Sequence, residues 1–171
     1  MYGSSLQRDL YQWLGSRQWD NAIAFTGHLR SGVADRYMGS ASSRYMAAAR
    51  QNRFFCSRVD RAVFGSSAKA SRGGKRVPRV LVVEEGAART HVHGCFAFPA
   101  WIEAPEAAET LIRCWVDGPY GLNDVECTPI STEVFASDAG RSWGGYILKQ
   151  VDGKSFAVDY NTLVLPAADK N

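Results

Sequence analysis

Two of the three histidines in this 171-residue chain, His91 and His93, are separated by a single valine. The surrounding residues, Thr90 to Phe98, are rich in the apolar and β-branched types that favour a strand. Residues two apart in a strand point to the same face, so this spacing would place two imidazoles side by side. A lone histidine in a strand is usually structural, whereas two on one face favour a metal site.

A carboxylate that could complete this site precedes the pair. Residues 79–83 (RVLVV) predict a strand that would form a hairpin with the strand carrying His91. If Ala87 and Ala88 form the turn, Glu84 lies opposite His91; a three-residue turn at 86–88 brings Glu85 to that face instead. Glu84 is the first choice and Glu85 the alternative. Two imidazoles and a carboxylate suit Mn²⁺ or Mg²⁺, which would polarise a scissile phosphate.

A second reactive pair lies downstream in residues 142–151 (SWGGYILKQV), which predict a short helix despite two glycines. Tyr146 and Lys149 are three residues apart and would project from the same side of that helix. The phenol of Tyr146 could attack phosphorus once it is deprotonated. Lys149 could favour the ionised phenol, bind the phosphate, or both. Trp143, Ile147 and Val151 form the apolar stripe that would fix this helix to a sheet.

The remaining pattern predicts the elements that must position these groups. A helix begins at Ser4-Ser5 and ends at Gly15, and further helices cover residues 42–64 and 105–116. Strands are predicted at 21–27, 79–83, 90–98, 124–130 and 162–165. This order favours a single α+β domain over 1–171, a ferredoxin/RRM-like sandwich in which helices flank a central, mostly antiparallel five-stranded sheet.

Positive charge is concentrated in the first half of the chain. Residues 1–79 hold 14 Lys and Arg against four Asp, whereas residues 80–171 hold six Lys and Arg against 13 acids. Residues 65–77 carry no acid, and we predict that they form a flexible basic loop rather than a packed element. The cationic side chains that could hold DNA phosphates are Arg50, Arg53, Lys69, Arg72, Lys75 and Arg76. Trp19, Phe25 or Tyr45 could stack on bases.

Composition excludes several other classes. No run of about 18 apolar residues is present, so no membrane span is expected. The four cysteines (56, 95, 114 and 127) form no C-x-x-C pair, which argues against a zinc ribbon and favours reduced thiols in a cytoplasmic or nuclear compartment.

Taken together, the strand at residues 22–27 (AIAFTG), the HVHG motif at 91–94 and Tyr146-x-x-Lys149 resemble the replication-initiator (Rep) class of HUH endonucleases, which have a single catalytic tyrosine. The resemblance covers nearly the whole chain. It implies that His91, His93 and a nearby Glu hold a divalent metal ion. It also implies that Tyr146 is the nucleophile that nicks and rejoins single-stranded DNA through a 5′-phosphotyrosine intermediate.

In that family the reaction initiates rolling-circle-type replication of a plasmid, phage or virus. The implied partners are single-stranded DNA at a replication origin or hairpin and a host or fused helicase, and no membrane. The implied location is the cytoplasm, or the host nucleus for a eukaryotic virus. No helicase segment follows here, which predicts a stand-alone nuclease or the nuclease domain of a larger protein.

Three other classes fit the sequence less well. A histidine-triad hydrolase needs a third histidine at position 95, which is Cys, and two-histidine phosphoesterases need a second motif where only His28 remains. The stronger alternative is a non-catalytic nucleic-acid-binding module on an RRM-like fold, with structural histidines and with Phe96 and Phe98 as base-stacking residues.

Overall fold

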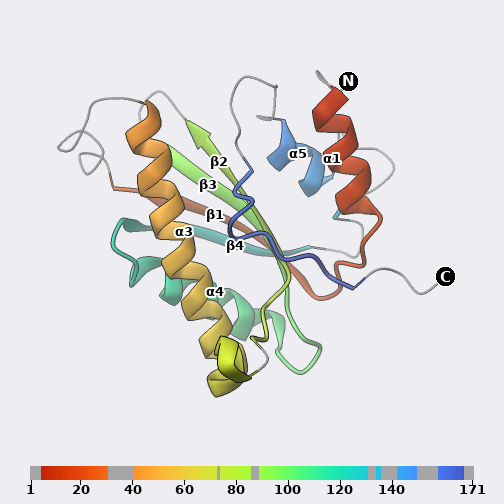
Figure 1. Ribbon diagram of the computed structural model, residues 1–171, viewed down its shortest axis with the longest axis vertical. Helices are drawn as coiled ribbons and strands as arrows, with labels where there is room; N and C mark the ends of the chain where they lie inside the picture. The colour runs from red at the N-terminus through yellow and green to blue at the C-terminus, as the bar shows by residue number, and fades with distance from the viewer. Residues whose placement is uncertain are drawn as a thin grey trace.

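The computed structural model describes residues 5–30, 41–72, 74–85, 89–130, 134–135, 142–149 and 158–167 (Figure 1). The helices are α1 (Ser5–Gly15), α3 (Ala41–Phe64), α4 (Ala104–Val116) and α5 (Trp143–Leu148). The strands are β1 (Ala22–Leu29), β2 (Arg79–Glu85), β3 (Thr90–Ala97) and β4 (Gly121–Ile130). The helices, the hairpin strands and the strands near 21–27 and 124–130 are therefore confirmed. Val151 and the turn residues 86–88 lie outside the described residues.

The four strands form one antiparallel sheet in the order β2-β3-β1-β4. From β1 to β4 the elements follow the β-α-β-β-α-β order of the ferredoxin-like split motif, which fits the predicted α+β class.

The predicted fifth strand at 162–165 is not confirmed. Among the described residues 158–167, the C-terminal segment pairs with β2 in two isolated bridges, Arg79 with Val164 and Val82 with Val158. Between them the chain turns: Thr162 donates its backbone N–H to the carbonyl of Asp159, so no continuous ladder forms.

The sheet is covered on both faces, because α3 and α4 pack on one face and α1 and α5 on the other (Figure 1). Alternation along β1 explains this arrangement: Phe25 points into the α3/α4 core, while Ala22 points into the α1/α5 core. Aromatic rings fill the first core, where Phe25 stacks on Phe55 with centroids 4.9 Å apart and meets Trp115 edge-on at 5.1 Å. The second core is smaller and leaves the far end of its face to polar residues.

The prediction that residues 65–77 form no packed element is wrong. They contain two short 3₁₀ helices, Gly65–Ala68 and Ala70–Arg72, and Val77 is fully buried. The cause is a carboxylate in α3 that the sequence pattern did not connect to this stretch. Asp60 accepts a hydrogen bond from the backbone N–H of Val77 at 2.8 Å, and Arg76 donates to the carbonyl of Ala68.

Candidate active site

Sheet register places the predicted metal ligands on one face of the sheet. Glu84 on β2 pairs directly with His91 on β3, and Glu85 pairs with Thr90, as expected for the two-residue turn. Directly paired residues of antiparallel strands share a face, so Glu84 lies on the face of both histidines and the backbone position of Glu85 on the other. The register prediction is confirmed, and the role of Glu84 as a ligand stays a prediction.

His93 is the most enclosed member of the group, with 3% of its surface exposed. Its Nε2 lies 2.7 Å from Oε2 of Glu84, and its Nδ1 lies 3.0 Å from the hydroxyl of Thr26 on β1. A carboxylate can only accept, so Nε2 carries the hydrogen, and in a neutral ring Nδ1 accepts from the threonine hydroxyl. The two contacts define both the tautomer and the orientation of the ring.

Both predicted ligand histidines favour the neutral form that binds metals. Burial lowers the pKa of His93, although the hydrogen bond and charge of Glu84 oppose this effect. The pKa of His91 is also lowered, first by burial and then by the nearby His28. An imidazole whose pKa lies below its ordinary value is mostly neutral at pH 7, and a neutral ring nitrogen is the metal ligand.

The third histidine belongs to the same cluster, although the sequence pattern alone did not place it there. His28 on β1 pairs with His91, and their ring centroids are 4.3 Å apart. Its Nδ1 lies 3.0 Å from the backbone carbonyl and 3.5 Å from the carboxylate of Asp124 on β4. The polar residues Thr26 and His28, alternating with Phe25 and Leu29, were the available signal that this strand has one polar half-face.

Tyr146 reaches this cluster from α5. Its ring meets that of His93 edge-on with centroids 5.4 Å apart, and it stacks on Trp143 at 5.2 Å. The ammonium nitrogen of Lys149 lies 3.7 Å from the centroid of the Tyr146 ring, within the range of a cation–π contact. Tyr146 keeps 43% of its surface exposed, so its phenol remains accessible to a large substrate.

Helix α1 and the sheet hold α5 in place. Ser142 caps α5 by accepting from the N–H of Gly145 at 3.1 Å, and its hydroxyl lies 2.7 Å from that of Tyr11. At the other end, the Gln7 amide donates to the carbonyl of Leu148 at 2.8 Å. Trp143 donates its indole N–H to the carbonyl of Gly94 on β3 at 2.8 Å, which links the helix directly to the histidine strand.

One glycine of α5 is required by close packing. A Cβ atom at Gly144 would lie 2.1 Å from Cδ1 of Phe135, far inside van der Waals contact. The Phe135 ring, which is partly buried, packs against Tyr11 and Trp19, with ring centroids 5.5 and 5.6 Å away. The glycine that weakens the helix pattern in the sequence therefore lets α5 approach its support.

Glu84 and His93 are a hydrogen-bonded pair, and their 2.7 Å contact is made through the hydrogen on Nε2 of His93. An ion bound to both side chains would have to replace that hydrogen, because a metal ligand nitrogen must be unprotonated. Within the described ranges, no three His, Cys, Asp or Glu side chains are placed to hold a metal together. His91, whose ring centroid lies 6.1 Å from that of His93, would have to turn toward the pair to complete the predicted set.

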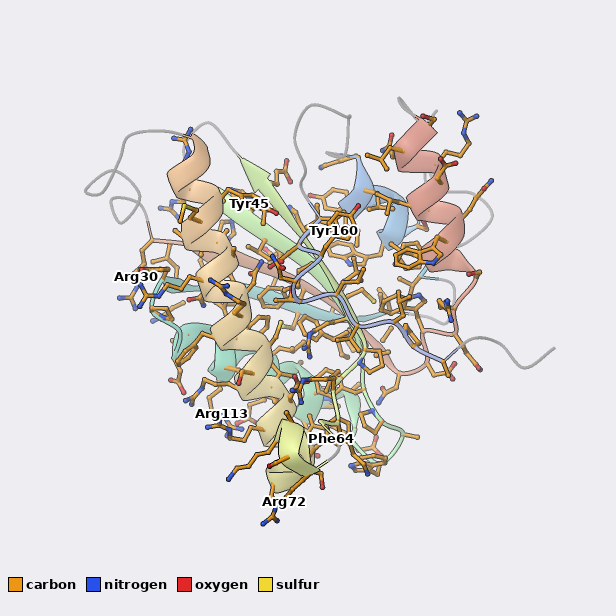
Figure 2. All side chains as sticks on the ribbon, viewed as in Figure 1. Arg30, Tyr45, Phe64, Arg72, Arg113 and Tyr160 are labelled. Atoms are coloured by element: carbon orange, nitrogen blue, oxygen red, sulfur yellow. The ribbon has the colours of Figure 1, made fainter. Side chains whose placement is uncertain are left out.

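The predicted DNA-binding cations are not gathered at this cluster. Arg50 and Arg53 lie on α3, which covers the opposite face of the sheet. Arg72 lies at the end of the molecule away from α5 (Figure 2). The other three, Lys69, Lys75 and Arg76, follow α3 in the same basic stretch. Three of the six, Arg53, Lys69 and Arg76, line one pocket beside α3.

Two of the predicted base-stacking residues are core residues instead. Trp19 and Phe25 are 3% and 0% exposed, so they cannot stack on bases, whereas Tyr45 is partly buried against the core. Phe96 and Phe98, the stacking residues of the RRM-like alternative, are equally buried. The sequence shows that these positions are aromatic but not that helices cover Phe25 and Phe96 on the sheet.

Comparisons of this chain with known protein families, with curated proteins and with solved structures found no match. In the described part of the chain, no helix is both long and apolar enough to cross a membrane.

Proposed function

We propose that this protein is a metal-dependent endonuclease that nicks and rejoins single-stranded DNA through Tyr146. The observation that supports this best is the contact between three separate segments. The ring of an accessible tyrosine on α5, with a lysine over it, has its centroid 5.4 Å from that of a histidine ring. That histidine is hydrogen-bonded to a carboxylate across the hairpin.

The proposed reaction is a transesterification. The Oη of Tyr146 forms a bond to phosphorus while the bond between phosphorus and the 3′ oxygen breaks. The phenol gives up its proton and the departing 3′ oxygen takes one, leaving a 5′-phosphotyrosine and a free 3′-OH. Because one phosphodiester replaces another, rejoining needs no ATP.

Each side chain has a distinct part in this reaction. Lys149 places a cation beside the ring on which charge develops and near the incoming phosphate. Trp143 and His93 fix the plane of the phenol by ring contacts. Glu84, His93 and His91 are the residues that would hold Mn²⁺ or Mg²⁺. The bound ion would supply polarisation of the scissile phosphate.

The proposed substrate is single-stranded DNA at the replication origin or hairpin of a plasmid, phage or virus. The reaction would initiate rolling-circle-type replication there, with a host or fused helicase as partner, in the cytoplasm or a host nucleus.

The test is covalent capture. The chain is incubated with 5′-labelled and 3′-labelled single-stranded oligonucleotides and Mn²⁺, and the product is examined under denaturing conditions for a protein–DNA adduct. We expect an adduct with the strand 3′ of the cut, its loss with chelator, and its loss in Tyr146→Phe. Tyr160→Phe is the matched control, because Tyr160 has a similar exposed fraction, 46%, on a different segment. An adduct that persists in Tyr146→Phe would refute the mechanism.

The same experiment separates the non-catalytic RRM-like alternative, which predicts DNA binding without an adduct. The burial of Phe96 and Phe98, and the packing of α1 and α5 on the face opposite to them, leave that alternative without its expected open stacking surface.

A further inference from the structure

A polar pocket of about 180 Å³ lies on the side of the sheet away from Tyr146, where α3, the 3₁₀ segments and the C-terminal segment meet. Its lining includes Arg53, Ser57 and Arg61 from α3, Lys69 and Arg76 from the basic stretch, and Asn161 from the C-terminal segment. Asn52 on α3 donates to the carboxylate of Asp159 at 3.0 Å, which keeps the C-terminal wall against the helix.

The pocket is strongly cationic. Five of its side chains are Lys or Arg and one, Asp60, is a carboxylate. That carboxylate is already engaged: Arg79 donates to its two oxygens at 2.5 and 3.0 Å, and Arg76 lies 3.3 Å away. The single negative charge is thus balanced within the floor of the pocket by the buried guanidinium of Arg79.

The cationic side chains at the rim of the pocket are not neutralised in this way. Arg53, Arg61 and Lys69 are exposed, and none has an ion-pair partner in the part of the chain that the structure describes. Elsewhere on the same helix, Arg58 does pair with Asp117 at 2.5 Å. Like charges gathered around one hollow repel, and a bound anion would remove that cost.

We propose that this pocket binds a phosphate group. Cationic side chains are donors without acceptors, so the ligand must be anionic and rich in acceptor oxygens, and guanidinium groups match phosphate geometry. The hydroxyl of Ser57 and the amide of Asn161 supply neutral donors. The volume exceeds the ~10–15 Å³ that one water requires but falls below the ~300 Å³ at which pockets for whole small molecules begin. A phosphate group fits between these limits.

The test uses pyrophosphate as the probe, measured by titration calorimetry at constant ionic strength. We expect one pyrophosphate per chain, and affinity about 100-fold weaker in Arg53→Gln/Arg61→Gln, which corresponds to about tenfold for each guanidinium removed. Lys69→Gln should weaken binding about tenfold by itself. Arg8→Gln/Arg113→Gln removes the same charge from exposed positions outside the pocket and should bind as the parent does. Absence of saturable binding in the parent, or equal binding by the Arg53/Arg61 variant, would overturn the proposal.

A second measurement identifies the source of the phosphate. If pyrophosphate competes with a short DNA duplex, and the Arg53/Arg61 variant lowers the salt dependence of duplex binding by about two phosphate contacts, the ligand is a nucleic-acid backbone. If the duplex binds parent and variant equally while only the parent binds pyrophosphate, the ligand is a free phosphate compound. The proposal does not rest on nicking: Tyr146→Phe should bind pyrophosphate normally, so the two proposals can fail separately.

Discussion

Replacing Gly144 by alanine should destabilise the protein even though alanine is the better helix former. The new Cβ would lie 2.1 Å from Cδ1 of Phe135, so either that ring or α5 must move by more than an ångström to reach ordinary contact. Tyr11 and Trp19 limit the movement of the ring on two sides, and the clash is severe, so we place the cost at the upper end of the overpacking range, about 3 kcal/mol. The gain in helix propensity is at most about 1 kcal/mol.

The net loss is therefore about 2 kcal/mol, which for a chain of this size lowers Tm by roughly 4–8 °C. Thermal and urea unfolding followed by circular dichroism measure it directly. Displacement of α5 also moves Tyr146, and a misplacement of about 1 Å costs on the order of 100-fold in the rate of adduct formation. Gly144→Ala/Phe135→Ala, which removes the obstructing ring, should lose less stability than the two single changes together. A Gly144→Ala chain as stable as the parent would refute the packing argument.

Three further predictions test other parts of the structure. Asp60→Asn leaves the buried Arg79 guanidinium without its counter-charge and should lower the free energy of unfolding in urea by about 3–5 kcal/mol. The double change Asp60→Leu/Arg79→Met should lower it less. A loss below about 1 kcal/mol in Asp60→Asn would contradict the buried pair. The four cysteines are free thiols, and burial raises the pKa of Cys56 to about 12. A thiol reagent should therefore react slowly with the folded chain, and it should react with all four thiols once the chain is denatured. Lys149→Met should slow adduct formation on the order of 100-fold without loss of stability, whereas Lys149→Arg should retain most activity; equal rates for Lys149→Met and the parent would remove the lysine from the mechanism.

Local patterns predicted most of the fold. Helical periodicity located α3 and α4, and a continuous β-branched run at 79–83 located the hairpin, because both depend on contacts between near neighbours in the sequence. The register of Glu84 against His91 was also predictable, since a short turn determines which residues pair. The basic stretch after α3 was wrongly predicted because its order comes from Asp60 and Arg79, whose ion pair spans 19 residues and leaves no periodic signal.

The sequence pattern also predicted only part of the candidate site, because contacts between residues far apart in the sequence leave no periodic signal. His91 and Glu84 face each other across one hairpin, but His28 joins them only because β1 lies beside β3 in the sheet, and strand order depends on the whole core. Conversely, the sequence predicts that Phe25 could stack on bases, whereas in the structure α3 and Trp115 cover it. The placement of Tyr146 depends on hydrogen bonds from α1, more than 130 residues earlier in the chain. A nucleophile held by such distant supports should be sensitive to substitutions in α1 that touch neither the histidines nor the substrate. Gln7→Met, which removes the donor to the carbonyl of Leu148 while keeping the side-chain length, is the change that should show it: adduct formation should fall more steeply than stability does.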